Sequence, residues 1–267
     1  MIELTEKDKK YLASKSGLLM HNEIGTFLDE CFYELKDATE LGRTYRPSVN
    51  RFAMFFLECG VDVFRDFNSV IIHPYTFCNI PMLKEVVIPE GVECIQMFAF
   101  KGCRNLTKVV FPSSLYQLGS SSFYDCNRLE VVEFSDTIEI IQPRAFTRTS
   151  ILNLSLPDSI TFIGENAFRA TSIMSLKLPA KLQSLEEYVF AYCTNLTDVE
   201  IPDSVEKIEA GAFAGCTSLR RVRLPANLKK LDVHAFQSCK LTEVYIPSTI
   251  DRDIWEGEFH PDSVFLI

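Results

Sequence analysis

Five cysteines at one repeated position are the most conspicuous reactive groups of this chain. They are Cys103, Cys126, Cys193, Cys216 and Cys239, separated by 23 residues or, once, by 67. Thiolates bind metals and form redox pairs, but a metal site needs ligands that converge in a tetrahedron. Side chains at one position of units stacked about 5 Å apart would form a line. The intervening positions hold Thr149 and Thr171, so the column is predicted to be a structural slot for small buried side chains.

The other reactive residues show no arrangement that a catalytic or metal site would need. The histidines are scattered, and none has a second ligand at a metal-binding interval: His21, His73, His234 and His260. Ser120, Ser121 and Ser122 lack the glycines of a nucleophile elbow, and no glycine-rich loop could hold a phosphate. We therefore expect no catalytic residue, no metal site, no cofactor, and a protein that is not an enzyme.

The elements that position these residues repeat every 22 or 23 residues. One column of the repeat holds proline, with Ser135 in its gap: Pro89, Pro112, Pro157, Pro179, Pro202, Pro225 and Pro247. A second column holds phenylalanine: Phe77, Phe100, Phe123, Phe146, Phe168, Phe190, Phe213 and Phe236, with Phe259 as a ninth candidate. Two columns of different chemistry with the same period indicate a repeat protein, in which the chain length determines the number of coils.

Each coil opens with a short apolar pattern that predicts a β-strand. In one coil it reads Leu196-x-x-Val199-x-Ile201, followed by Pro202. Strands at a constant spacing are expected to stack in parallel about 4.8 Å apart, and proline ends each strand because it cannot donate to the ladder. A small residue usually precedes the phenylalanine of each coil, which predicts a tight turn and a buried spine of stacked rings.

The complete pattern, Leu-x-x-Val-x-Ile-Pro-x-x-Val-x-x-Ile-x-x-x-Ala-Phe-x-x-Cys-x-x-Leu, resembles the BspA-like leucine-rich repeat family. The resemblance covers about residues 61–260. It implies a curved solenoid with a parallel sheet on one face, and a role in binding other macromolecules, often at a bacterial or protist surface. The expected fold class is therefore an α+β repeat protein: a leucine-rich-repeat solenoid with a parallel β-sheet on one face and a helical N-terminal cap.

Two regions are expected along the chain. Residues 1–60 lack the repeat, and apolar residues from Ile24 to Leu41 recur at helical steps of three and four. This region is expected to be a helical N-terminal cap or a small helical module that binds a partner. Residues 61–267 are expected to form a leucine-rich-repeat solenoid of about eight coils of 22–23 residues, with residues 250–267 as its C-terminal closing segment.

The residues that the repeat leaves free are those pointing outward from the first strand of each coil, and we call this surface the strand face. Its candidates for partner binding are Arg221, Arg223, Tyr245, Asp198, Glu200 and Lys177. Arg and Tyr are frequent anchors of protein interfaces, which favours protein binding. Alternatively, oppositely charged neighbours such as Asp198 and Arg221 only pair with each other across adjacent strands.

Composition and the N-terminal sequence limit the expected classes of partner and the expected cellular location. The formal net charge of -9 argues against a nucleic-acid partner, and no apolar run approaches the roughly 20 residues of a membrane span. The N-terminus does not resemble a secretory signal, and nine cysteines is an odd number. Both features favour a reducing, cytoplasmic location. The alternative is a secreted or cell-surface protein whose leader was removed.

The expected function is a non-catalytic protein–protein interaction module that uses the strand face, as an intracellular adaptor or inhibitor. The alternative is an exported or surface-associated adhesin-like protein that binds host macromolecules. The partner is expected to be a protein, which the sequence does not identify. The apolar run Ser263–Ile267 would close the last coil or, if exposed, support a dimer through a solenoid end, so both monomer and dimer stay open.

Overall fold

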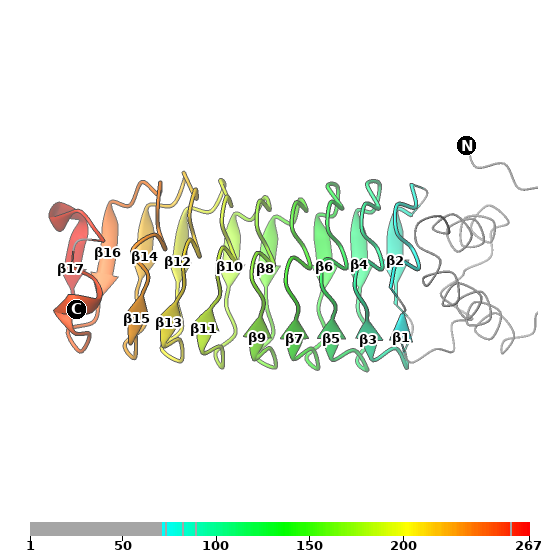
Figure 1. The fold of residues 1–267 in the computed structure, drawn as a ribbon, viewed down its shortest axis with the longest axis horizontal. Helices are drawn as coiled ribbons and strands as arrows, with labels where there is room; N and C mark the ends of the chain where they lie inside the picture. The colour runs from blue at the N-terminus through cyan, green and yellow to red at the C-terminus, as the bar shows by residue number, and fades with distance from the viewer. Residues whose placement is uncertain (1–70, 73, 82, 89, 257) are drawn as a thin grey trace, which may run out of the picture.

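The computed structural model describes residues 71–267, except 73, 82, 89 and 257. In this part of the chain, short strands alternate between two rows that run the length of a parallel β-solenoid (Figure 1). Every strand pairing within the rows is parallel, which confirms the predicted stacking of coils. The chain therefore passes from one row to the other and back once in each coil.

The first row carries the strand face. Its strands are β2 (Glu85–Val87), β4 (Lys108–Val110), β6 (Val131–Glu133), β8 (Asn153–Ser155), β10 (Ser175–Lys177), β12 (Asp198–Glu200), β14 (Arg221–Arg223), β16 (Glu243–Ile246) and β17 (Val264–Leu266). In β12, Val199 is buried while Asp198 and Glu200 are exposed, so alternation places the middle residue in the core and its neighbours outside. The outward positions expected from the sequence are those observed.

The second row uses the second apolar pair of each coil. Its strands are β1 (Ile71–Ile72), β3 (Cys94–Ile95), β5 (Gln117–Leu118), β7 (Ile140–Ile141), β9 (Phe162–Ile163), β11 (Ser184–Leu185), β13 (Lys207–Ile208) and β15 (Lys230–Leu231). In the coil of β13, Val205 and Ile208 are both fully buried. The core therefore lies between the two rows.

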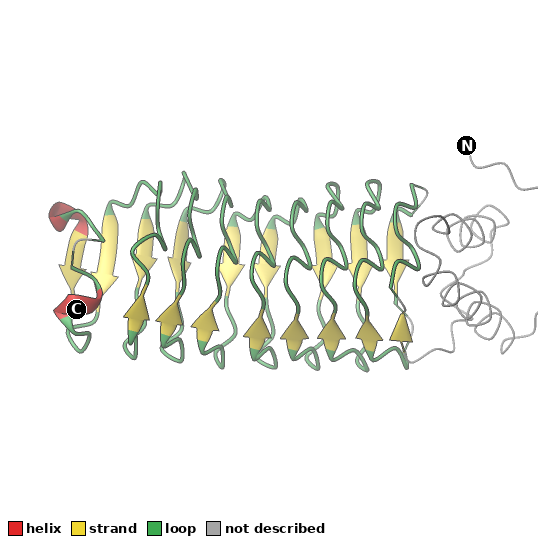
Figure 2. Cartoon of the chain, in the orientation of Figure 1, coloured by secondary structure: helices red, strands yellow, loops and turns green. Residues whose placement is uncertain are grey.

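The expected α+β class is wrong for the described residues, which form a β-solenoid. Their helical segments are two 3-10 turns near the C-terminus, η1 (Arg252–Ile254) and η2 (Pro261–Ser263), as Figure 2 shows. Residues of positive φ flank the spine phenylalanines: Tyr188 at 54° and Tyr192 at 61° lie either side of Phe190. A right-handed helix cannot include such residues. The helices expected in residues 1–60, and the boundary near residue 60, lie outside the described residues.

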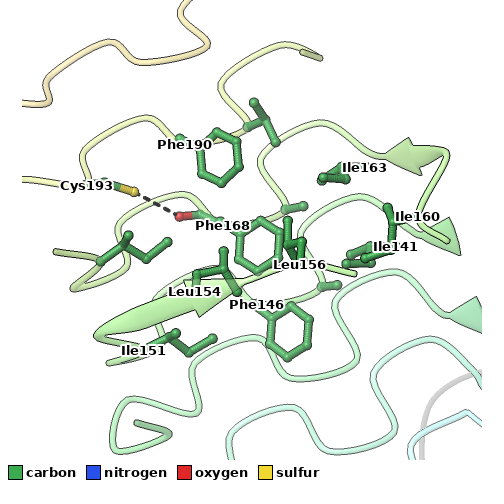
Figure 3. Close-up of a cluster of buried hydrophobic side chains, with 14 of the residues drawn as sticks. Ile141, Phe146, Ile151, Leu154, Leu156, Ile160, Ile163, Phe168, Phe190 and Cys193 are labelled. Carbon is green, nitrogen blue, oxygen red and sulfur yellow. Dashed lines mark hydrogen bonds between the residues drawn. The ribbon is translucent and has the colours of Figure 1, made fainter. Parts of the chain in front are cut away.

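The predicted phenylalanine spine is confirmed. Phe146 and Phe168 stack with ring centroids 5.3 Å apart and planes 8° apart, and Phe168 and Phe190 follow at 5.5 Å (Figure 3). At the C-terminal end the spine continues through Phe236 to Phe259, whose centroids lie 5.6 Å apart with the planes tilted by 53°. Phe259 is thus the ninth ring of the column.

The cysteine column is structural, as predicted. Each thiol donates to the carbonyl oxygen of the spine phenylalanine one coil earlier: Cys103 Sγ lies 2.9 Å from Phe77 O, and Cys216 Sγ lies 3.2 Å from Phe190 O. Figure 3 shows the same contact for Cys193. The Thr149 hydroxyl donates instead to Phe146 O within its own coil, at 2.9 Å. The column therefore satisfies carbonyl oxygens beside the spine.

The C-terminal end adds one more strand to the first row. The strand β17 pairs in parallel with β16, and Phe265 stacks on Tyr245 with ring centroids 5.4 Å apart. Trp255 is partly buried against the core. At this end, Phe265 and Leu266 stay 45% and 65% exposed.

Candidate functional site

The hydrogen-bonded ladder of the strand face is interrupted twice. The first row divides into the sheets β2-β4-β6, β8-β10 and β12-β14-β16-β17, and the wider spacing is visible in Figure 1. No backbone hydrogen bond among the described residues joins β10 to β12. Each interruption therefore breaks the otherwise regular surface of the strand face.

Both interruptions flank the two coils in which threonine replaces cysteine. These coils have one residue fewer between the spine turn and the next strand, since Thr149-Ser-Ile151 stands where Cys126-Asn-Arg-Leu129 stands one coil earlier. The coil of β16 is also short, yet β14 and β16 are paired. The missing residue alone therefore does not open the ladder.

The interruption between β10 and β12 opens a shallow hollow of about 490 Å³, here called the β10–β12 hollow. Its lining residues are Met174, Ser175, Leu176, Asp198, Val199, Glu200, Arg221, Arg223 and Tyr245. Five of the six residues singled out in the sequence thus come together around one depression. The sixth, Lys177, lines a neighbouring hollow of about 620 Å³ together with Lys181, Asp136 and Asp158.

Arg221 is the centre of a charged network in the β10–β12 hollow. Its Nε lies 2.8 Å from Glu243 Oε2 and its Nη1 lies 3.7 Å from Asp198 Oδ1, so it contacts both neighbouring strands. The Tyr245 hydroxyl donates to Glu243 Oε2 at 3.0 Å. The hydrogen bonds from Arg221 and Tyr245 lower the pKa of Glu243, and the same carboxylate raises the pKa of Tyr245.

Arg223 is held by a separate contact at the rim. Its Nη1 lies 3.2 Å from Asp203 Oδ1, and the same oxygen accepts from the Ala226 backbone N–H at 2.8 Å. The Ala226 hydrogen bond, followed by the Arg223 contact, lowers the pKa of Asp203. The pairing of neighbouring charges expected as the alternative role thus occurs at Arg221.

Two of the six candidates carry charges without an ion-pair partner in the described residues. They are Glu200 in β12 and Lys177 in β10, which occupy the third position of adjacent strands on either side of the interruption. Elsewhere on the strand face, Lys108 of β4 lies 2.5 Å from Glu133 of the adjacent strand β6. Glu200 and Lys177, one on each side of the interruption, are therefore free to pair with a partner.

Sequence reasoning missed Met174, whose side chain is 57% exposed at the edge of the β10–β12 hollow. The repeat contained a signal for it. The equivalent position in each coil holds Lys84, Thr107, Glu130, Leu152, Met174, Thr197, Arg220 and Thr242. The column is polar except in the two coils in which threonine replaces cysteine, where Leu152 and Met174 are both exposed. An apolar residue in a polar outward column would have pointed to this place.

The described residues hold neither a metal cluster nor a membrane-spanning helix. No group of three or more His, Cys, Asp or Glu side chains there could hold a metal ion. No helix in these residues has the length and apolar character to cross a membrane.

Comparison with known families gives one match. The model of the BspA type leucine rich repeat region matches six copies over residues 70–197 and 184–260. No protein of curated function matches the sequence. The matched ranges contain both interruptions of the strand face and all six candidate residues.

Solved structures of bacterial leucine-rich repeat proteins are similar in fold. The T. pallidum leucine rich repeat protein is 22% identical, with a TM-score of 0.52, and the alignment covers 69% of this chain and 84% of that one. The pneumococcal vaccine antigen PcpA is 20% identical over 67% of this chain and 68% of its own, with a TM-score of 0.35. A leucine rich cell surface protein from Faecalibacterium prausnitzii is 20% identical over 70% and 78%, with a TM-score of 0.33. At these identities the likeness concerns the fold, and only the first score is high enough to support it.

Proposed function

The chain belongs to the BspA-type leucine-rich repeat family, and from this premise we propose that it is a non-catalytic module that binds another protein through its strand face. Leucine-rich repeat proteins of this kind generally serve protein interaction or occur in surface proteins. Solenoids bind partners with long surfaces made of equivalent positions in successive coils. The strand face has this form, whereas the spine and the thiol column are occupied by internal packing.

The observation that carries the proposal is the β10–β12 hollow. Met174, Tyr245 and Arg221 line it together. Tyr and Arg are enriched among the residues that dominate binding energy, and a flexible Met side chain adapts to different partner surfaces. Because the depression lies within an otherwise regular sheet surface, an apolar side chain of the partner could enter it beside Met174.

The unpaired charges give the interface its polarity. Glu200 and Lys177 have no ion-pair partner among the described residues, so a partner would meet one negative and one positive charge across the interruption. Arg221 and Arg223 are already held by carboxylates, which orders them before a partner arrives. Pre-ordered side chains lose less entropy on binding.

The test compares charge reversals on opposite faces. Random-peptide display against the wild-type protein supplies binding peptides, and their affinity is measured for Arg221→Glu with Arg223→Glu. We expect binding of strand-face peptides to weaken at least tenfold. The melting temperature should change little, because Arg221 is 55% and Arg223 34% exposed, and ion pairs in contact with solvent contribute little stability. The control, Lys229→Glu with Lys230→Glu, makes the same charge change on the second row. Peptides that bind both variants as tightly as wild type would refute the strand-face assignment.

The proposed location is the interior of a cell, where the protein would act as an adaptor or inhibitor. The support is the use of thiols as hydrogen-bond donors in the core, which a reducing compartment preserves. The alternative is an exported, adhesin-like protein that binds host macromolecules. Fractionation of native cells with an antibody to the solenoid separates the two: recovery from the culture medium or the cell surface would sink the intracellular proposal.

The C-terminal end of the solenoid offers a surface through which a dimer could form. The strand β17 is the last of its sheet, and Leu266 is exposed there. Edge strands with exposed apolar residues favour pairing with another chain. Both a monomer and a dimer through this end are compatible with the proposal, and sedimentation of the wild type and of Leu266→Lys distinguishes them: a dimer that dissociates in the variant pairs through β17.

A further inference from the structure

A second surface, on the turns beside the phenylalanine spine, alternates aromatic rings with cations. We call it the turn stripe and define it by Phe98, Lys101, Tyr124, Arg148, Arg169 and Tyr192. Lys101 Nζ lies 5.1 Å from the ring centroid of Phe98 and 5.4 Å from that of Tyr124. These are cation–π distances, so each cation is held over a ring.

The turn stripe is continuous from coil to coil. The Arg148 guanidinium lies 5.9 Å from the ring centroid of Tyr124, and the Arg169 guanidinium lies 5.0 Å from that of Tyr192. The Arg148 backbone N–H donates to Arg169 O at 2.9 Å, which joins the two halves of the stripe. The stripe therefore crosses five consecutive coils, from that of Phe100 to that of Phe190.

The stripe is positively charged although the chain as a whole is negative. Within the described residues, Lys101 and Arg169 contact no carboxylate, and Arg148 contacts Asp125 at 3.5 Å. Arg104 and Arg128 lie in the same turns, where Arg128 binds the neutral Asn105 side chain at 3.2 Å. The positive charge on these turns is therefore only partly neutralised.

The pattern stops after Tyr192. In the next two coils the two positions after the spine phenylalanine hold Ala214, Gly215, Gln237 and Ser238, which offer neither ring nor charge. The position of Phe98 holds Gly211 and then His234. Acidic residues are found in the last coil of the stripe, at Glu186 and Glu187, and in the coil that follows it, at Glu209. The basic surface is thus bounded, and its length is that of four coil spacings, about 20 Å at the ordinary distance between strands.

We propose that the turn stripe binds a short, extended acidic segment of a protein. An extended peptide of about six residues spans the 20 Å of the stripe. A longer polyanion such as a nucleic acid would run onto the acidic coils that follow. The Phe98 ring contacts Lys101 and stacks on Tyr75, and the Tyr124 ring contacts Lys101 and Arg148. These two rings therefore offer no open face on which bases could stack. The surface is distinct from the strand face, and this proposal does not depend on the function assigned there.

The experiment uses fluorescence anisotropy with a labelled hexaglutamate peptide at low salt. We expect the wild type to bind it, and Lys101→Gln with Arg148→Gln and Arg169→Gln to bind at least tenfold more weakly. The matched control, Lys207→Gln with Lys229→Gln and Lys240→Gln, removes the same charge elsewhere and should change the affinity less than twofold. Because the triple variant could lose stability, Arg169→Gln alone is measured as well, with an expected loss of about threefold.

Three outcomes would overturn the proposal. The first is absence of binding by the wild type. The second is an equal loss in the stripe variants and in the control, which would mean that net charge alone governs the interaction. The third is tighter binding of a six-nucleotide oligothymidylate than of hexaglutamate, which would assign the stripe to single-stranded nucleic acid. A selective loss in both stripe variants, with the peptide preferred, supports an acidic protein segment.

Discussion

Glu258, at the C-terminal end of the solenoid, predicts a stability that falls as the pH rises. In the preceding coil the spine N–H of Phe213 donates to Ala235 O at 2.8 Å. At the end of the spine, the backbone N–H of Phe236 donates instead to the Glu258 side chain, with 3.5 Å between N and Oε1. Burial of the carboxyl outweighs this hydrogen bond and raises the pKa of Glu258 from 4.5 to about 7.

The direction and size of the effect follow from proton linkage. Between pH 4.5 and 7 the folded protein keeps the Glu258 proton that the unfolded chain releases, so stability is lost as the pH rises through this window. Below pH 4.5 both states are protonated and the penalty is absent. Taken at face value, the pKa shift from 4.5 to about 7 corresponds to a loss of about 3 kcal/mol. Because Glu258 is only half-buried, solvent screening reduces the expected loss to about 1 kcal/mol.

Urea unfolding followed through Trp255 measures this effect where it occurs. Trp255 is the single tryptophan, and it packs against the C-terminal end of the core. We expect Glu258→Gln to be about 1 kcal/mol more stable than wild type at pH 8 and to differ far less at pH 5. Equal differences between the two proteins at both pH values would refute the linkage to Glu258.

Three further predictions concern the architecture. Phe168→Ala leaves a cavity in the fully buried spine and should lower the free energy of unfolding by about 3–5 kcal/mol, measured in urea. Ala170 is exposed and adopts the left-handed conformation, with φ at 55°. Ala170→Gly removes the Cβ that disfavours this conformation and should raise the free energy of unfolding by about 1 kcal/mol; a decrease would contradict a left-handed conformation at this position. Gly215→Ala places a Cβ 2.7 Å from the Tyr192 ring at a φ of 74°, so calorimetry should show a loss of about 1–3 kcal/mol, which Tyr192→Ala should partly restore.

The repeat made the strand face predictable. Because side chains alternate along a strand, Asp198 and Glu200 had to face away from Val199, and parallel stacking placed Arg221 and Arg223 beside them. The spine was equally accessible, since one phenylalanine per coil at a constant period can be buried only as a stack. These features depend on the period alone, which is why sequence was sufficient for them.

The hollow was not predictable in the same way. Whether β10 and β12 form hydrogen bonds depends on the offset between their coils, and the short coil at β16 shows that residue count does not determine it. The exposure of Met174 depends on that offset as well. The signal in the sequence was the polar column interrupted by Leu152 and Met174. It indicates where along the solenoid the surface differs, but it does not predict the offset between the coils.

The second row of strands was not predicted, since one strand per coil was expected. The spacing of Val205 and Ile208, three residues apart, also suits a helix, and two-residue strands such as β13 are too short to show alternation. The left-handed turns that exclude a helix were hidden because most of their positions hold ordinary side chains, among them Tyr188 and Tyr192. In one coil both positions are glycine, Gly211 and Gly215, and that pair was the visible trace of the turns.

The most direct test of the proposed function places a photo-reactive benzoylphenylalanine at Tyr245 in the β10–β12 hollow and, in a second protein, at the exposed Phe162 of the second row. Each is irradiated in extract of the native cells, and crosslinked proteins are identified by mass spectrometry. Binding through the strand face predicts that a protein crosslinks to position 245 and not to position 162. Crosslinking at position 162 with none at 245 would contradict it.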